Sequence, residues 1–331
     1  MRSRTKNLLK NEQIEMLIKA NFGENTVVHQ IEELKGGMCN SAYVIELGEN
    51  YRIVLKVSMS PEAPLLWHEG DNMAAEIEAY RLVKEHTTIP VPKVLYFDFS
   101  KTLINSRYFF MEYMTGETLK KAAKKISPDN LNRIKQELAG YLTQIHRIKG
   151  DYFGYLTTDE RRQYGSWKDA YASWFPNILL DAKKHGYSLS YNRIEKVLPK
   201  AYEYLETVHA PRLIHNDFWA GNVFVVCRDG EYEIQGITDF ERAAWGDPLA
   251  EFHFNAGIIK NIWEEPAFWA SYAGSGKELS GDDILKIHIY KLYLWLIMLA
   301  ESYRYPHLFG WGQRLFSRQM AMKSLSALER G

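Results

Sequence analysis

The sequence has few cysteines, no net charge and no long apolar run, and each absence excludes a class of protein. Cys39 and Cys227 are the only cysteines in 331 residues, which excludes a disulfide framework and favours a reducing compartment, so we expect a cytoplasmic protein. Basic and acidic side chains number 41 each, which argues against a nucleic-acid binder. The longest apolar run, residues 292–300, is far shorter than the ~20 residues that a membrane span needs, and residues 1–13 lack the apolar core of a secretory signal.

The pattern of turns and apolar positions predicts an α+β protein with two lobes. Strands are expected at residues 27–34, 41–47, 51–57, 93–99 and 107–114, and a helix is expected at residues 71–86. Tight turns between the first three strands favour an antiparallel sheet over a parallel one. The pattern becomes helical after Gly116. We therefore predict a five-stranded antiparallel N-terminal lobe over residues 1–114 and a helical lobe over residues 115–331.

The richest stretch for chemistry is the string H-x-D-x-x-x-x-N formed by His215, Asp217 and Asn222. Its loop-forming residues allow polar side chains to converge on one point. A β-branched strand, a turn with an Asp-Gly signal and a returning strand follow it, and Asp239 stands at the end of the second strand. This hairpin places Asn222 and Asp239 at the same end of a strand pair, close enough to share a metal ion.

These residues have the pattern that phosphoryl transfer to a hydroxyl group requires. Asp217 would face the acceptor hydroxyl, while Asn222 and Asp239 would hold Mg²⁺ on the phosphates of a nucleotide. Either aspartate alone would be read as an ordinary turn residue. The complete spaced set favours a kinase that uses ATP or GTP.

The same residues resemble those of the aminoglycoside phosphotransferase and choline kinase family, which are small-molecule kinases built on the protein-kinase fold. The segment 246–251, GDPLAE, is similar to the family's G-D-P-x-x-D tail. The resemblance implies that His215 holds the catalytic loop and that Asp247 supports that loop by hydrogen bonds. Asn216 and Glu241 depart from protein kinases, which have Arg and Gly there, and no long activation segment follows.

The resemblance extends to a nucleotide site in the N-terminal lobe. Lys56 stands in the third strand, like the kinase lysine that binds nucleotide phosphates, and its expected partner is Glu76, with Glu78 as the alternative. The sequence alone would also fit a solvent-facing lysine. The main-chain groups of Glu112 and Met114 correspond to the family's hinge, which binds the base. The candidate phosphate loop supplies backbone donors and polar side chains from Gly36, Gly37, Asn40 and Ser41.

The acceptor is less defined than the nucleotide. An aminoglycoside, choline and a ketosamine are all candidates, the last because residues 218–221, FWAG, are similar to the L-W-S-G of ketosamine kinases. The many aromatic residues between 151 and 190 favour core packing over a substrate pocket, although both are open. Acidic residues in the later helices could attract an amine. A non-catalytic nucleotide-binding module and a protein kinase are the rival interpretations.

Overall fold

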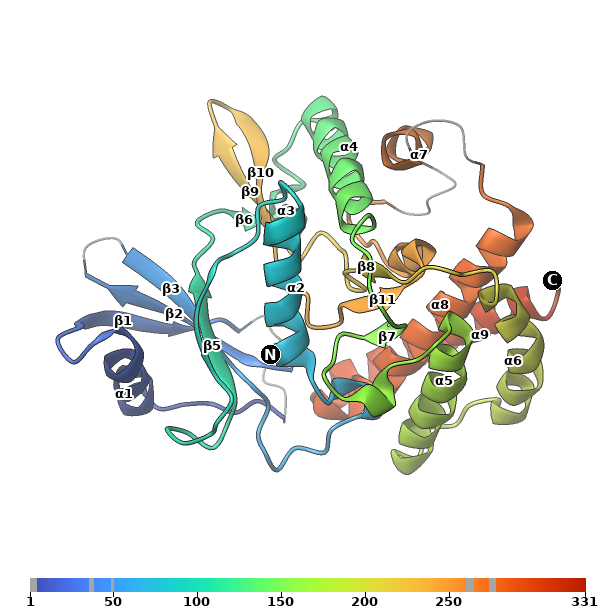
Figure 1. Cartoon of the computed structure of the whole chain (residues 1–331), viewed down its shortest axis with the longest axis horizontal. Coiled ribbons are helices and arrows are strands. Elements are labelled where there is room, and N and C mark those ends of the chain that lie inside the picture. Colours follow the sequence, from blue (N-terminus) through green and yellow to red (C-terminus); the bar gives the residue numbers. More distant parts are fainter. Residues whose placement is uncertain (1–4, 36–38, 49–50, 260–264, 274–277) are drawn as a thin grey trace. The chain divides into compact units, whose positions relative to one another are not determined.

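The computed structural model describes residues 5–35, 39–48, 51–259, 265–273 and 278–331 (Figure 1). The chain forms two compact units, each made of separate segments. Unit 1 comprises Met1–Leu65, Pro92–Thr115 and Arg304–Gly310, and unit 2 comprises Leu66–Val91, Gly116–Tyr303 and Trp311–Gly331. A division into lobes at residues 114 and 115 stays a prediction, and the segment 66–91 groups here with unit 2.

Unit 1 is an antiparallel sheet with one helix packed on it. The strand order is β1-β2-β3-β5-β4, and every neighbouring pair is antiparallel. Helix α1 carries Ile14, Leu17 and Ile18 on one face, and these side chains are buried against Ile45, Leu55 and other sheet residues. The bounds are α1 Asn11–Phe22, β1 Val28–Glu33, β2 Ser41–Leu47, β3 Tyr51–Val57, β4 Val94–Asp98 and β5 Tyr108–Glu112. The five-stranded antiparallel sheet is therefore confirmed.

Unit 2 contains the remaining helices and two small three-stranded sheets. One sheet has the order β10-β9-β6 and the other β7-β11-β8. The sheet strands are β6 Glu117–Thr118, β7 Gly154–Tyr155, β8 Arg212–Ile214, β9 Val223–Arg228, β10 Glu231–Ile237 and β11 Ala244–Gly246. The α-helices are α2 Asn72–His86, α3 Leu119–Ala122, α4 Pro128–Ile145, α5 Trp167–Lys184, α6 Tyr191–Leu205, α7 Pro266–Ala273 and α8 Gly281–Ala300. Short 3₁₀ segments are η1 Trp67–Glu69, η2 Glu160–Arg162 and η3 Pro248–His253. The segment η5 Glu301–Arg304 and the helix α9 His307–Leu328 contain residues of both units.

The core of unit 2 is aromatic and lies where α5, α6 and α8 pack on one another (Figure 1). Trp167 and Trp174 of α5 are almost fully buried, with ring centroids 5.4 Å apart. Tyr155 stacks on Trp174 at 4.3 Å, and Tyr293 of α8 stacks on its ring at 5.5 Å. The packing interpretation of the aromatic region is confirmed for these side chains.

The long helix α8 contains the longest apolar run of the sequence. Ser280 caps its first turn, with its hydroxyl oxygen accepting from the backbone N–H of Asp283 at 3.1 Å. The run at residues 292–300 is buried within this helix, as predicted. Among the helices that the structure describes, none combines the length and the apolar character needed to cross a membrane.

Candidate active site

The loop between β8 and β9 carries the H-x-D-x-x-x-x-N string. Asn222 donates from its side-chain amide to the carbonyl oxygen of Asp217 at 3.0 Å and to the carboxylate Oδ2 of Asp217 at 3.2 Å. His215 is fully buried, and Asn216 adopts a left-handed backbone with φ of 62°. The spacing of five residues therefore brings the predicted base and the predicted amide ligand into direct contact.

Glu251 holds the start of this loop. One of its carboxylate oxygens accepts from the backbone N–H of His215 at 2.7 Å, and the other accepts from the N–H of Asn216 at 3.0 Å. The ring Nε2 of His146 lies 3.4 Å from the same carboxylate, and its Nδ1 lies 2.7 Å from the hydroxyl of Tyr272. Burial by itself raises the pKa of Glu251, but His146 and the backbone donors outweigh it and lower that pKa below its usual value.

A second loop, after β10, is bonded to the first through main-chain atoms. The backbone N–H of Thr238 donates to the carbonyl of Asn222 at 2.9 Å, and the ring Nε2 of His215 lies 3.0 Å from the carbonyl of Thr238. The ring of Phe240 packs on His215 with centroids 4.1 Å apart. These contacts place Asp239 beside the catalytic loop, as the hairpin predicted.

Three carboxylates meet at this second loop. Ligand atoms of Glu76 from α2, Asp239 and Glu241 all lie within 4.8 Å of one another. Glu76 is fully buried, whereas the side chain of Glu78 is about half exposed and paired with Arg81 at 2.7 Å. Carboxylate and amide oxygens are the ligands that Mg²⁺ prefers, so the donor set fits that ion. Glu241, which the metal prediction had not included, is a third possible ligand.

The surroundings of Asp217 alter its acidity. Its removal from water raises the pKa of its carboxyl above the usual value, and the charge of Asp239 adds to the rise. The Arg242 guanidinium is the strongest opposing influence, with smaller ones from His215 and Asn222. The pKa of Asp217 is thus moved toward neutral pH, which is the direction that favours proton transfer.

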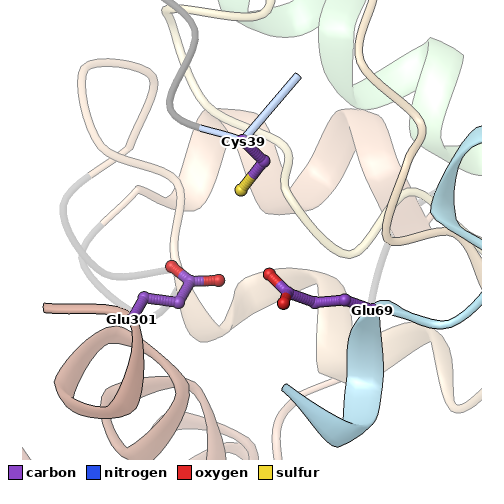
Figure 2. Close-up of side chains that lie close together, drawn as sticks. All are labelled: Cys39, Glu69 and Glu301. Atoms are coloured by element: carbon purple, nitrogen blue, oxygen red, sulfur yellow. The ribbon is translucent and has the colours of Figure 1, made fainter. Parts of the chain in front are cut away.

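Arg242 belongs to a buried charged group that the sequence did not predict. Its Nη2 lies 2.7 Å from Oε1 of Glu301, and Nε2 of His68 lies 3.3 Å from the same oxygen. The carboxylates of Glu69 and Glu301 point toward one another (Figure 2). Glu301 is buried, so the guanidinium of Arg242 beside it is needed to balance its charge.

A family model supplies the observation that decides the assignment. The model of the phosphotransferase enzyme family matches residues 30–281, which include both loops of the site. The chain belongs to this family. It is therefore a phosphotransferase enzyme.

Solved structures share the fold of this phosphotransferase. It aligns with the aminoglycoside phosphotransferase APH(4)-Ia, crystallised with AMP-PNP and hygromycin B, at 18% identity and a TM-score of 0.64, covering 95% of this chain and 98% of the other. A protein of Thermobifida fusca named as a fructosamine-3-kinase aligns at 18% identity and a TM-score of 0.65, covering 96% and 99%. These likenesses confirm a kinase-like α+β fold.

A curated relative is much longer than this chain. The probable acyl-CoA dehydrogenase IBR3 of Arabidopsis thaliana is 23% identical over 246 residues, which are 71% of this chain. The phosphotransferase spans only 28% of the length of that relative.

The predicted phosphate-binding residues lie in unit 1. Gly36 and Gly37 fall outside the described residues. Asn40 precedes β2 and Ser41 begins it, and the buried hydroxyl of Ser41 has no hydrogen-bond partner among the residues that the structure describes. Lys56 stands in β3, opposite Phe109 of β5, with its Nζ 5.9 Å from the centre of that ring. The pairing of Lys56 with Glu76 stays a prediction.

The predicted hinge ends β5. The backbone N–H of Glu112 donates to the carbonyl of Lys93 at 3.0 Å, and its carboxylate accepts from the N–H of Lys93 at 3.1 Å. Since that N–H is used within the sheet, a nucleotide base would have to bond other main-chain atoms of Glu112 and Met114. Base recognition by this segment stays a prediction.

One expectation for this phosphotransferase is wrong. Asp247 does not bond the catalytic loop: it caps η3 by accepting from the N–H of Leu249 at 3.0 Å and accepts from the hydroxyl of Tyr290 at 2.6 Å. Glu251, four residues later, bonds the loop instead, because η3 turns that side chain toward β8. His146, which caps the C-terminal end of α4, is buried and contacts Glu251.

The sequence also did not predict a small cavity beside the catalytic loop. Tyrosines of the aromatic core line this cavity, together with Asn216 of the catalytic loop and Arg242. Its lining residues are Tyr155, Tyr171, Asn216, Arg242, His253, Tyr290, Tyr293, Leu294 and Ile297. The high aromatic content of residues 151–190 was the only signal for it.

Proposed function

We propose that this phosphotransferase moves the γ-phosphoryl group of ATP or GTP to a hydroxyl group of a small molecule. The observation that carries the proposal is the contact between Asp217 and Asn222 on a loop that is bonded to the loop of Asp239. Those three side chains are the base, the amide and the carboxylate that phosphoryl transfer uses. The nucleotide bound to APH(4)-Ia supports ATP as donor.

In the proposed reaction, Asp217 accepts the proton of the acceptor hydroxyl while the hydroxyl oxygen attacks the γ-phosphorus. The bond from that phosphorus to the β–γ bridging oxygen breaks, and the nucleoside diphosphate leaves. Asn222 and Asp239, with Glu76 or Glu241 nearby, would hold Mg²⁺, which would neutralise charge on the phosphates when bound. Lys56 would bind the nucleotide phosphates, together with donors of the loop at residues 36–41.

Most of the rate enhancement would come from positioning, because a loose phosphoryl transition state asks for little covalent chemistry from the protein. Glu251 would contribute by fixing the backbone that precedes Asp217, and His215 by accepting the N–H of Asp217 at its ring Nδ1. The rise in the pKa of Asp217 supports its role as base.

The acceptor we propose is a hydroxylated, amine-bearing metabolite of the aminoglycoside type. The likeness to APH(4)-Ia with bound hygromycin B supports it, and the likeness to a protein named as a fructosamine-3-kinase keeps a ketosamine as a candidate. Choline is a third candidate from the resemblance of the motifs. The curated relative is named as an acyl-CoA dehydrogenase, so an acyl-CoA thioester that carries the hydroxyl group required here is a fourth candidate. A cytoplasmic location, without nucleic acid or membrane partners, stays our expectation.

The test is transfer of labelled γ-phosphate from ATP or GTP, with Mg²⁺, to separate pools of aminoglycosides, amino alcohols, ketosamines and hydroxyacyl thioesters. Asp217→Ala should lower kcat about 10²- to 10⁴-fold, the usual contribution of a general base, with nucleotide binding nearly unchanged. Asp282→Ala, at an exposed aspartate in the first turn of α8, is the matched control and should retain full activity.

The other outcomes separate the rival functions. Full activity of Asp217→Ala would refute the assigned base. Nucleotide binding without transfer to any pool would favour a binding module, and labelling of a peptide library would favour a protein kinase.

A further inference from the structure

One peptide group of the site, between Thr238 and Asp239, is bonded at both of its polar atoms. Its carbonyl oxygen lies 3.0 Å from the ring Nε2 of His215. Its N–H donates to the hydroxyl of Tyr80 at 3.0 Å. Because a peptide group is planar, two bonds at its opposite edges fix the orientation of the whole plane. His215 was expected to have such a holding role, whereas nothing in the sequence singled out Tyr80.

The hydrogen atoms at Tyr80 can be assigned from chemistry. The N–H of Asp239 can only donate, so the tyrosine oxygen must accept there. The tyrosine hydroxyl in turn donates to Oε1 of Glu76 at 2.8 Å, one helical turn earlier in α2. These two hydrogen bonds need a group that accepts one and donates the other, which a tyrosine hydroxyl can do and a phenylalanine ring cannot. Tyr80 and Glu76 are buried, so water has little access to replace the hydroxyl.

The orientation of this peptide matters because Asp239 has an uncommon backbone. Its φ is 69°, in the left-handed region that non-glycine residues seldom occupy, and the surrounding bonds must hold it there. The ring of Tyr80 also packs edge-to-face on Phe240 at 5.5 Å. Rotation of the 238–239 plane would redirect the Asp239 carboxylate away from Glu76 and Glu241, whose ligand atoms now lie within 4.8 Å of it.

We propose that Tyr80 is a positioning residue for the metal site, whose hydroxyl holds the backbone of Asp239 and joins it to the carboxylate of Glu76. The inference rests on the proposed function, in which Asp239 binds Mg²⁺. In this arrangement the hydroxyl oxygen of Tyr80 connects helix α2 to the loop that carries Asp239. Loss of that oxygen should weaken metal-dependent nucleotide binding and leave acceptor binding unchanged.

The experiment compares wild-type protein with Tyr80→Phe, which keeps the ring and removes the hydroxyl. Binding of AMP-PNP is followed calorimetrically while Mg²⁺ is varied. The Mg²⁺ concentration for half-maximal binding should rise about tenfold in Tyr80→Phe, a change of ~1.4 kcal/mol that is within the range expected for losing the two hydrogen bonds of this hydroxyl. The KM for the acceptor should stay within a factor of two, a split that a general loss of structure would not produce.

Tyr141→Phe is the matched control. Its hydroxyl also donates to a glutamate one turn earlier, Oε1 of Glu137 at 2.5 Å, but on helix α4. It should leave the Mg²⁺ requirement unchanged. A second variant, Tyr80→Leu, removes ring and hydroxyl together, and thermal melting of each protein identifies any variant that has lost its fold.

The outcomes distinguish this inference from the proposed function. An unchanged Mg²⁺ requirement in Tyr80→Phe, with a raised requirement only in Tyr80→Leu, would assign the effect to ring packing and overturn the inference. Metal-independent AMP-PNP binding by the wild-type protein would also overturn it. If the Mg²⁺ requirement of Tyr80→Phe rises tenfold but the wild-type protein transfers phosphate to no acceptor, the proposed function is refuted and the positioning role of Tyr80 is supported.

Discussion

Replacing Glu251 tests whether one buried carboxylate holds the catalytic loop. It is fully buried and accepts two backbone N–H groups, at 2.7 and 3.0 Å. Hydrogen bonds to a charged acceptor each contribute about 1.5–3 kcal/mol. Glutamine keeps one oxygen and turns an amide donor toward the other N–H, so Glu251→Gln should reduce the free energy of unfolding by about 2–4 kcal/mol.

The pH dependence of the free energy of unfolding tests the same prediction independently. The pKa of Glu251 in the folded protein lies below its usual value of 4.5. The charge of Glu251 therefore contributes its full stabilisation above pH 4.5, and this contribution is lost as the pH falls through the lowered folded pKa. The difference between wild type and Glu251→Gln should be largest near neutral pH and should shrink in acid.

Urea unfolding followed by tryptophan fluorescence is a suitable assay, because the eight tryptophans among the described residues lie in unit 2 with Glu251. Glu78→Gln is the control, since that glutamate pairs with Arg81 on the exposed face of α2 and should alter stability little. Phosphotransfer should fall together with stability in Glu251→Gln, because Asp217 directly follows the two residues whose N–H groups Glu251 holds. Equal stability of wild type and Glu251→Gln at pH 7, or a difference that does not change with pH, would refute the reasoning.

Two further predictions concern the charge beside Asp217 and the aromatic core. Arg242→Met removes the strongest charge that lowers the pKa of Asp217, so it should raise that pKa and move the acid limb of the pH–rate profile to higher pH. The double variant Arg242→Met/Glu301→Gln is the control that keeps the buried charge balanced. An acid limb that does not move in either variant would contradict the assignment of Asp217 as the base. Trp174→Ala should reduce the free energy of unfolding by about 3–5 kcal/mol in the same urea assay, since the ring is 1% exposed, whereas Leu180→Ala on the exposed side of α5 should change it little. Similar values for these two variants would show that the aromatic core is not where unit 2 gains its stability.

Local patterns predicted the sheet and the central hairpin well. Strands β2 and β3 have the bounds that their apolar spacing and turn residues indicated, and helix α2 begins one residue after its expected start. The hairpin of β9 and β10 begins and ends within one or two residues of its expected positions. In each case the signal lies in neighbouring residues, which is where periodicity and turn chemistry act.

Contacts between distant residues could not be predicted in the same way. Glu251 meets His146 across 105 positions, and Arg242 meets Glu301 across 59. Nothing in the sequence around Glu251 distinguishes it from Asp247, and only the turn of η3 decides which carboxylate reaches β8. Helix α9 was missed because apolar side chains such as Leu308 and Trp311 are exposed on it, which weakens the two-faced pattern of a packed helix.

The discontinuous make-up of the two units has a consequence for how the protein is synthesised. Unit 1 takes its last segment from residues 304–310, and unit 2 takes its first from residues 66–91. A ribosome that has released only the first 115 residues has therefore not delivered all of unit 1, and it has already delivered the helix that carries Glu76 and Tyr80. A fragment cut near residue 115 would therefore contain neither unit complete.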